Sequence, residues 1–354
     1  MRNAYPVSRR QFLIQSATAL AWLRLQKTAL AQGAWSPEID LMYYPWYGGP
    51  DDDYLHWRDG GRNPERGDIA ANFFPKKWPY SSKDQKLLKW HCRMIRDMGV
   101  RRLVLSYWGR GSFTDKAIPY LMHLLPNYGL TACFHIESFE GRNNGQRFKT
   151  EIHYLLGRYG GHPAFYRDAE GRPLFYVWAP HLPPTQLHAD HYISDGSWQR
   201  MLDELRNELG PTLYLAQSLD LGRTQLGHFS GLYFYGPFFS DQQVVEITAA
   251  ARQAGLVVSG SASPGYDDRR AHRDSSRPTI HRAAGQYYRS TWDLVRISRP
   301  DRINITSFNE WHEGTQIEPA RRGYRGMSGY SNYDPAGGMF YVEETKRQIA
   351  GLGG

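Results

Sequence analysis

The chain has 354 residues but only two cysteines, Cys92 and Cys133. A disulfide between them is compatible with an oxidising compartment, but nothing in the sequence requires it. Each lies in an apolar segment that we predict to be regular structure, so both are interpreted as small buried hydrophobic residues. The sequence also lacks the spacing of cysteine and histidine that is typical of metal sites. It therefore predicts neither a metal ion nor another cofactor.

The sequence also has no apolar run long enough to span a membrane. The run at 12–23 is short and is followed by Arg24 and Lys27. A twin-arginine pattern at 8–13 precedes it, and the small residues at 29–31 form a typical cleavage site. We therefore expect residues 1–31 to be a bacterial export signal that is removed. The mature protein is then expected in the periplasm or outside the cell, without a stable membrane span.

The excess of positive charge is smaller than the whole sequence suggests. The formal net charge is +8, but residues 1–31 carry five of the basic residues and no acids, which leaves about +3 for residues 32–354. A working protein with so small a charge lacks the electrostatic footprint of a nucleic-acid binder. We therefore expect no nucleic-acid partner.

No glycine-rich phosphate loop follows the first strand, and no linker divides the chain. Apolar strand-like segments instead alternate with helical ones about eight times. This alternation predicts one (β/α)8 TIM barrel with long loops, over residues 32–354. A doubly wound open sheet is the alternative. The predicted strands are 39–47, 102–108, 130–138, 173–179, 212–219, 231–238, 256–263 and 302–308. The predicted helices are 84–98, 114–128, 146–159, 196–209, 241–254, 283–297 and 340–349, with one further turn of helix between the fifth and sixth strands.

Aromatic residues are abundant, at 14% of the chain, and many of them fall where the predicted strands end. In a TIM barrel the chemistry lies at the carboxyl ends of the strands, so these side chains should meet on one rim. Flat aromatic rings suit the C–H faces of sugars, although a single aromatic residue at such a position is more often part of the core. Acids reach the same rim, with Glu137 after the third strand and Glu310 and Glu313 after the eighth.

The segment 303–319 carries the strongest signal for chemistry. A buried strand is followed directly by Asn309, Glu310, Trp311, His312 and Glu313. Two carboxylates ~5 Å apart at an effective dielectric constant of ~20 repel each other by roughly 3 kcal/mol. This corresponds to about two pKa units, enough to keep one carboxyl protonated near neutral pH. A carboxylic acid beside a carboxylate is what cleavage of a glycosidic bond requires.

Several stretches together resemble the endo-α-mannosidase and endo-α-mannanase family of retaining glycoside hydrolases, family 99. They run through nearly the whole mature chain, and the last is the longest and most specific. The matching stretches are 43–48, 56–57, 134–137, 159–167, 174–177 and 307–318. The resemblance implies a (β/α)8 fold and an oligosaccharide or polysaccharide substrate containing internal α-mannosidic linkages, with α-1,2 the expected linkage. We expect the protein to act as a monomer.

The resemblance also implies a mechanism in which the 2-hydroxyl group of the sugar is the nucleophile, through a 1,2-anhydro intermediate. By motif position, Glu310 would be the base at the 2-hydroxyl and Glu313 the general acid. Sugar-binding residues are implied by the resemblance or predicted from their place on the rim and in the matching stretches. They are Tyr44, Trp46, His56, Trp57, Trp108, Glu137, Tyr176, Tyr235, Asn309 and Trp311.

The sequence departs from the family pattern at 106–109 and at Trp178 and Ala179, where substrate next to the cleaved bond would be bound. A different α-linked bacterial polysaccharide therefore stays open as the substrate. Two further alternatives are a glycan-binding barrel without activity and a metal-dependent hydrolase that uses His312, Glu310 and Glu313 as ligands.

Overall fold

The computed structural model describes residues 35–139, 145–181, 193–273, 275–321, 329–333 and 335–352. Eight parallel strands follow one another in chain order and close into a barrel, because β8 pairs with β1. The predicted (β/α)8 barrel is thus confirmed, and the open sheet is excluded. The strands are β1 (Glu38–Tyr43), β2 (Arg102–Tyr107), β3 (Thr131–Ile136), β4 (Leu174–Val177), β5 (Leu213–Gln217), β6 (Gly231–Tyr233), β7 (Val257–Ala262) and β8 (Arg302–Ile305).

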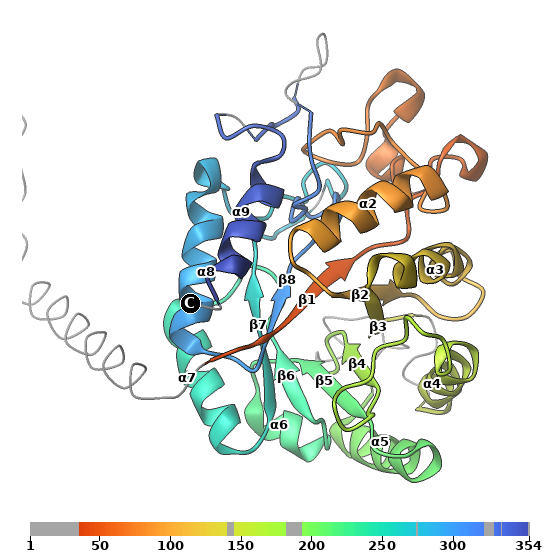
Figure 1. Ribbon diagram of the computed structural model, residues 1–354, viewed down its shortest axis with the longest axis vertical. Coiled ribbons are helices and arrows are strands. Elements are labelled where there is room, and N and C mark those ends of the chain that lie inside the picture. The colour runs from red at the N-terminus through yellow and green to blue at the C-terminus, as the bar shows by residue number, and fades with distance from the viewer. Residues whose placement is uncertain are drawn as a thin grey trace, which may run out of the picture. The chain divides into compact units, whose positions relative to one another are not determined.

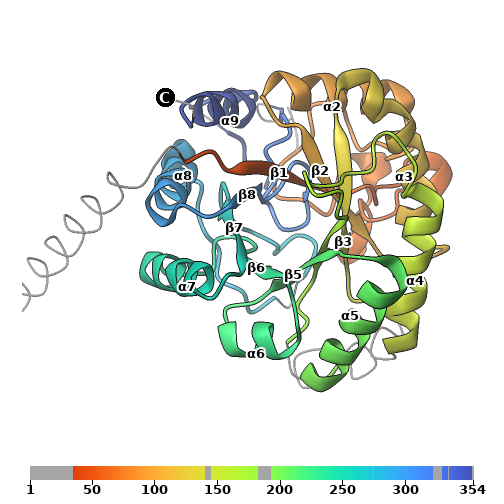
Figure 2. The same cartoon turned by 60° about the horizontal axis from the view of Figure 1, so that its bottom comes forward.

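The helices surround this barrel, and each strand except β8 is followed by a helix before the next strand (Figure 2). None of the helices in the described ranges is long and apolar enough to cross a membrane. The predicted export signal, 1–31, lies outside the described residues. The helices are α2 (Gln85–Asp97), α3 (Phe113–Leu124), α4 (Gly145–Tyr159), α5 (Asp195–Leu209), α6 (Leu221–Leu226), α7 (Asp241–Gln253), α8 (Gln286–Ser298) and α9 (Phe340–Ala350). Short 3₁₀ helices add Pro50–Asp52, Asp59–Gly61, Pro64–Arg66, Leu125–Tyr128 and Ala283–Gly285.

Helix α2 illustrates why these segments fold as they do. The Asp84 carboxylate caps the helix by accepting from the main-chain N–H groups of Lys86 and Leu87. This supplies partners for N–H groups that the first turn of a helix leaves free. One face of the helix is buried, including Cys92, and Gly99 ends the segment at φ +93°. Cys133 is buried in β3, and both cysteines are free thiols.

The first strand is shorter than predicted, because β1 ends at Tyr43 and not at residue 47. Beyond Tyr43 the chain leaves the barrel wall, and its polar groups find partners in loops. The N–H of Tyr44 donates to the side chain of Asn309, and the N–H of Tyr47 donates to Ser82 Oγ. The segment 44–47 is therefore a loop at the carboxyl end of β1, and its aromatic side chains do not alternate between two faces as they would in a strand.

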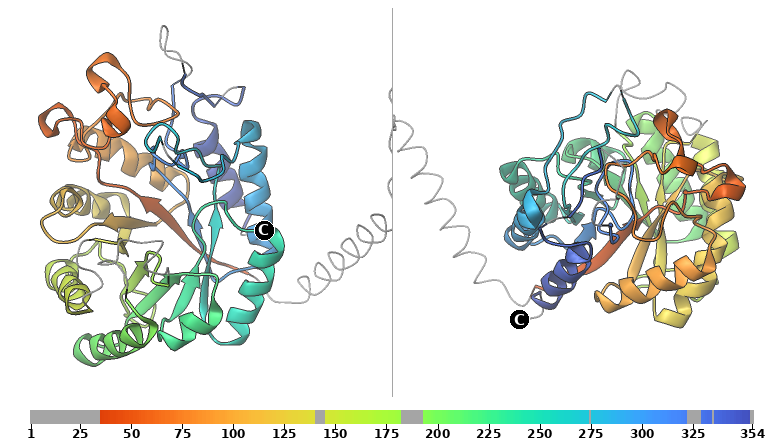
Figure 3. Two further views of the ribbon diagram at one scale, coloured as in Figure 1. Left: turned by 180° about the vertical axis from the view of Figure 1, so that it is seen from behind. Right: turned by 90° about the horizontal axis from the view of Figure 1, so that it is seen from above.

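Long loops cover the end of the barrel toward which the strands point (Figure 1). The segment between β1 and α2 is the largest of them and lies over the same end as the loop after β8 (Figure 3). Two isolated bridges join these loops, between Phe73 and Ser331 and between Pro75 and Ala320. We call this end of the barrel, with the side chains that its loops carry, the rim.

The opposite end of the barrel is closed by buried charges. Asp40 on β1 accepts hydrogen bonds from Arg102 and from Arg302, whose Nε lies 2.8 Å from Oδ2. Tyr176 also donates to Oδ2, at 2.6 Å. Burial alone would raise the pKa of Asp40, but the two guanidinium groups hold it well below its usual value. The carboxylate therefore stays ionised and pairs with both arginines.

This placement changes the role that the sequence predicted for Tyr176. The side chain is fully buried inside the barrel and points toward Asp40, away from the rim. Strand periodicity places Tyr176 inside the barrel but cannot tell toward which end its long side chain turns. We therefore remove Tyr176 from the sugar-binding residues and assign it to the closed end of the barrel.

Replacing Asp40 by Asn should destabilise the fold strongly, because two buried guanidinium groups lose their counter-ion. We expect a loss of about 3–5 kcal/mol in the free energy of unfolding, measured by urea titration. Glu38→Gln is the matched control, since Glu38 is 59% exposed and pairs with the same Arg102. It should cost under about 1 kcal/mol. Equal effects of the two substitutions would contradict the assignment.

Candidate active site

The turn after β8 closes on itself and so presents two acids at the rim. The main-chain N–H of Ser307 donates to Thr315 O at 2.9 Å, and Ser307 Oγ accepts from the N–H of Glu310 at 2.8 Å. Gly314 has φ +64°, and a Cβ there would lie 3.0 Å from Asp267 O. Only glycine fits this tight place without strain. Glu310 and Glu313 are thereby held on one turn.

Both acids are buried enough to disfavour a negative charge. Burial and the charge of Glu313 raise the pKa of Glu310 well above its ordinary value. Burial likewise raises the pKa of Glu313 to about 7, although Arg277 opposes this rise. Two nearby carboxyl groups titrate as one system, so the pair keeps at least one proton as the solution approaches neutrality.

Glu313 is contacted by one hydroxyl group and one guanidinium group. Tyr235 OH donates to Oε2 at 3.1 Å, and Arg277 Nη1 lies 3.3 Å from Oε1. Arg277 also donates to Tyr266 OH at 2.8 Å, and Tyr266 OH in turn donates to Asp268. The loop between β7 and α8 therefore holds a positive charge next to the acid.

Tyr44 and Tyr235 form a buried pair of hydroxyl groups 2.5 Å apart. Burial and the charges of Glu137, Glu310 and Glu313 raise the pKa of Tyr44 well above its ordinary value. Since Tyr235 donates to Glu313, Tyr44 must donate to Tyr235. The two tyrosines therefore stay neutral and carry an ordered chain of hydrogen bonds to the acid.

Glu137 is the third acid of this region and leaves β3 toward the same side chains. Its Oε1 accepts from Ser106 Oγ at 2.8 Å and lies 3.0 Å from His135 Nδ1. The second distance is short, but the angle is not that of a hydrogen bond, because His135 Nδ1 has no partner of good geometry. We therefore treat the Ser106 contact as the one that orients Glu137.

Three predicted sugar-binding residues form a row of roughly parallel rings on the rim. Trp46 stacks on His56, with ring centroids 4.4 Å apart and an interplanar angle of 27°. Trp108 lies on Trp46 with centroids 6.1 Å apart and an angle of 24°. Trp108 is 36% exposed, whereas Trp46 and His56 are partly buried. This row offers a flat apolar surface to a ligand.

Three other predicted residues are buried and make structural contacts. Asn309 accepts from the N–H of Tyr44 and donates to Tyr44 O, at 2.8 and 3.0 Å. Trp311 Nε1 donates to Glu318, and Trp57 Nε1 donates to Tyr80 O. All three side chains are fully buried. Their polar atoms have protein partners, so we assign them to positioning of the site and not to direct sugar contact.

His312 and Glu318, which lie in the same segment of the chain, also lie behind the acids. Glu318 is fully buried and accepts from Tyr80 OH at 2.6 Å, while its other oxygen lies 3.1 Å from His91 Nε2. The main-chain N–H of His312 donates to Glu310 Oε1 at 3.0 Å. The ring of His312 faces His56 and Asp59 instead of the acids.

Sequence reasoning missed Arg277 and Asp59. Arg277 lies in a long polar loop where arginines are frequent, and only the folded loop brings it to Glu313. Asp59 lies in the loop after β1 and meets His312 across 253 positions of sequence, which no spacing rule could show.

In the described residues, His56, Asp59 and His312 form a group whose ligand atoms lie within 4.8 Å of one another, as a metal site requires. Neither Glu310 nor Glu313 belongs to this group, which weakens the alternative of a metal-dependent hydrolase built on them.

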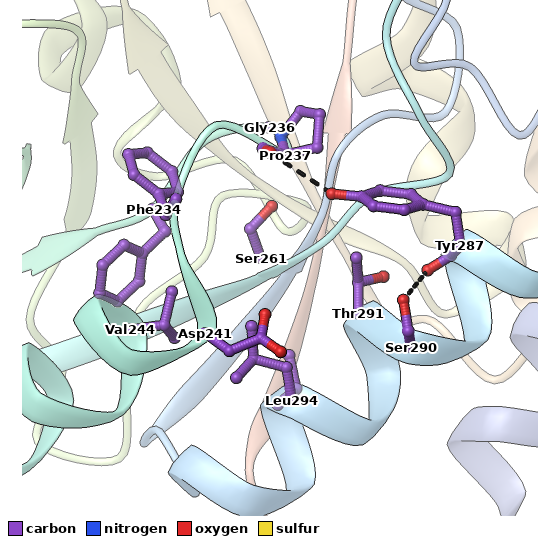
Figure 4. A pocket seen from close by; sticks show the side chains of 12 residues that line it. Phe234, Gly236, Pro237, Asp241, Val244, Ser261, Tyr287, Ser290, Thr291 and Leu294 are labelled. Carbon is purple, nitrogen blue, oxygen red and sulfur yellow. Dashed lines mark hydrogen bonds between the residues drawn. The ribbon is translucent and has the colours of Figure 1, made fainter. Parts of the chain in front are cut away.

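A small cavity lies elsewhere, outside the barrel wall between β7, α7 and α8 (Figure 4). Its volume is about 50 Å³, and its lining includes Phe234, Val244, Ser261 and Thr291. Pockets for small molecules are typically several hundred Å³, so this one suits a water molecule but not a sugar. This cavity is therefore not a candidate for the sugar-binding site.

A parallel barrel with paired acids and aromatic rings at the carboxyl ends of its strands is typical of hydrolases that act on glycosidic bonds. Residues 36–351 match the model of glycosyl hydrolase family 99. The chain belongs to this family and is a glycoside hydrolase.

Proteins of known function and structure agree with this assignment. A glycoprotein endo-α-1,2-mannosidase of Xenopus laevis is 30% identical over 347 residues, covering 88% of this chain and 76% of that protein. A glycoprotein endo-α-1,2-mannosidase-like protein of Danio rerio is 31% identical, with 88% and 77% covered. A family 99 endo-α-mannosidase structure from Bacteroides thetaiotaomicron superposes with a TM-score of 0.79 at 29% identity, covering 89% of this chain and 97% of that one.

Removal of the positive charge beside Glu313 should raise the pKa of that carboxyl above about 7, because Arg277 stabilises its ionised form. The variant is Arg277→Gln, and the measurement is a pH titration followed by ¹³C NMR of labelled glutamate carboxyl groups. Glu313→Gln assigns the signal. Arg269→Gln is the control, since Arg269 pairs with Asp267. An unchanged or lowered pKa in Arg277→Gln would refute this reading of the contact.

Proposed function

We propose that the protein is an endo-acting hydrolase that cleaves internal α-1,2-mannosidic linkages with retention of configuration. The observation that carries this proposal is the pair of acids, buried Glu310 and partly exposed Glu313, held on one turn at the rim of a family 99 barrel. The endo-α-mannosidase names of its relatives support the choice of sugar. The expected substrate is a mannan or another mannose-containing glycan.

The hydrogen-bonding groups of the bound sugar decide which of the two acids carries the proton. Main-chain N–H groups of His312 and Glu313 favour a negative charge on Glu310, whereas Arg277 and Tyr235 favour one on Glu313. The 2-hydroxyl group of a mannose can donate a hydrogen bond, but a glycosidic oxygen can only accept one. Glu310 beside the hydroxyl group is therefore ionised, and Glu313 beside the glycosidic oxygen is protonated.

The first step then proceeds without a nucleophile from the protein. Glu310 takes the proton of the 2-hydroxyl group, and O2 attacks C1 to form a 1,2-anhydro sugar. The bond from C1 to the leaving oxygen breaks, and that oxygen receives the proton of Glu313. In the second step Glu313 takes a proton from water and the water oxygen attacks C1. The bond from C1 to O2 breaks, and Glu310 returns its proton to O2. Each step inverts C1, so the configuration is retained.

The remaining residues of the rim are assigned to binding. Trp46, His56 and Trp108 would support a sugar face on their row of rings, because C–H groups pack well on flat aromatic surfaces. Tyr44 and Tyr235 would orient hydroxyl groups near the cleaved bond, and so would Glu137. We further propose that the protein is exported, as the twin-arginine pattern suggests, since a polysaccharide substrate lies outside the cytoplasm. We also propose that it works as a monomer.

A different α-linked bacterial polysaccharide is the second candidate substrate. The departures from the family pattern at 106–109 and at Trp178 and Ala179 favour it, because they fall at the carboxyl end of β2 and directly after β4, next to the rim. The same two acids would act on such a substrate, and only the sugars on either side of the cut would differ.

Substitution of either acid should abolish most of the activity on α-1,2-branched mannan. We expect Glu310→Gln and Glu313→Gln each to lower kcat/KM by at least ~10²-fold, since each loses one proton transfer. Released oligosaccharides are measured by mass spectrometry, with Glu343→Gln on the exposed side of α9 as the control. Near-normal turnover in either variant would refute the catalytic assignment. Products from no variant, wild type included, would refute mannan as the substrate.

Activity should also depend on pH through the shared proton. The wild-type rate is expected to fall as pH rises beyond about 7, because Glu313 then loses the proton that the leaving oxygen needs. The pH profile of kcat/KM measures this limb for the free enzyme. A rate that stays constant up to pH 9 would contradict the role of Glu313 as general acid.

A further inference from the structure

Beside the acids lies a cluster of nitrogen and oxygen atoms for which the proposed mechanism has no use. It consists of His56 and Asp59, from the loop after β1, and His312, from the turn after β8. His56 Nδ1 lies 3.0 Å from Asp59 Oδ2, and His312 Nε2 lies 3.9 Å from the same oxygen. All three ligand atoms lie within 4.8 Å of one another.

A main-chain oxygen completes this cluster. His56 O lies 2.5 Å from His312 Nε2, because His56 adopts φ +64° and its carbonyl group turns toward the imidazole. His56 O thus joins the three side-chain atoms through its contact with His312 Nε2.

The separations suit a small transition-metal ion. Four ligands at ~2.1 Å around Zn²⁺ lie ~3.4 Å from one another in a tetrahedron. The observed separations of 2.5, 3.0 and 3.9 Å bracket this value. His56 and Asp59 are partly exposed and can adjust, whereas His312 is held by its buried surroundings. The ion would replace the protons now shared between His56 and Asp59 and between His312 and the carbonyl group.

We propose that His56, Asp59, His312 and the carbonyl oxygen of His56 form a binding site for Zn²⁺ or a similar transition-metal ion, and that its occupation inhibits the enzyme. Imidazole and carboxylate ligands are those that such ions prefer. His272 lies next to His312, with ring centroids 6.1 Å apart, and adds a further imidazole at the edge of the site.

Inhibition follows from the connections of the three side chains. The main-chain N–H of His312 donates to Glu310 Oε1, so a metal that pulls on His312 disturbs the acid. His56 also stacks on Trp46, and the ring of His312 lies 5.5 Å from that of Trp46. A bound ion would therefore act on the base and on the aromatic row together. Only this inhibitory consequence rests on the proposed function, whereas metal binding does not.

Binding is tested first, with no need for a substrate. The purified protein, dialysed against a chelator, is titrated with ZnCl2 by calorimetry, and CoCl2 is added in a parallel sample to record visible absorption. We expect one ion per chain and a cobalt spectrum of four-coordinate type. Asp59→Asn should weaken binding at least tenfold, since even partners outside the ligand shell change affinity by 10–100-fold. Asp51→Asn, on the same loop and exposed, should bind as wild type does.

Equal affinity in wild type and Asp59→Asn, or no saturable binding in wild type, would overturn the site. Because His56→Gln removes a second ligand, it must also weaken binding, and circular dichroism shows whether each variant is folded. These results stand even if the protein proves inactive on every glycan tried.

Inhibition is tested second, on whichever glycan the wild-type protein cleaves. Zn²⁺ should lower the rate with a midpoint near the calorimetric Kd, and a chelator should restore it. Asp59→Asn should need at least tenfold more Zn²⁺ for the same inhibition. Full activity in the metal-saturated protein, or equal inhibition of Asp59→Asn, would overturn the inhibitory role while leaving the catalytic assignment intact.

Discussion

The side chain of Asn309 ties the two strands that close the barrel to each other, and the rest of the site depends on this tie. Its amide accepts from the N–H of Tyr44 and donates to Tyr44 O, across 265 positions of sequence. Such a reciprocal pair fixes both the distance and the orientation of two main-chain segments. Because Tyr44 follows β1 and Glu310 follows Asn309, the hydroxyl chain and the acids are held in one frame.

Because these segments are held in place, the fold itself determines the surroundings and the pKa values of the two acids. Glu310 is buried and receives main-chain N–H groups, while Glu313 is partly exposed and has Tyr235 and Arg277 beside it. Both pKa values rise because the barrel rim removes water, and the neighbours then bias the pair in opposite directions. Acids on flexible loops would repel each other apart and lose this sharing of a proton.

The sequence predicted the barrel, the eight strands and the two acids, because each rests on local pattern: alternation of segments, β-branched strands and adjacency within one motif. It could not predict which aromatic residues face a ligand. Trp108 and Trp311 both follow strands, yet Trp108 is exposed and Trp311 is buried against Glu318. The direction of each depends on the turn that carries it, and the turn after β8 is decided by contacts with Ser307 and Thr315. Tyr176 is a different case, because it lies within β4 and strand periodicity cannot tell toward which end of the barrel its side chain turns.

The two site residues that the sequence did not reveal, Arg277 and Asp59, both reach the site through contacts between distant loops. Contacts of this kind also connect the acids to the proposed metal-binding cluster. Arg277 and Asp59 come from loops, and each meets its partner through an approach between distant segments that burial of the aromatic residues enforces. His312 belongs to both groups, since its main chain holds Glu310 while its ring faces Asp59. A shift of the His312 ring can therefore affect Glu310 directly, because the two residues lie two positions apart on one turn and the N–H of His312 donates to Glu310. Because the turn is buried and closed on itself, it cannot absorb such a change by bending, and the two groups of residues are bound to respond together.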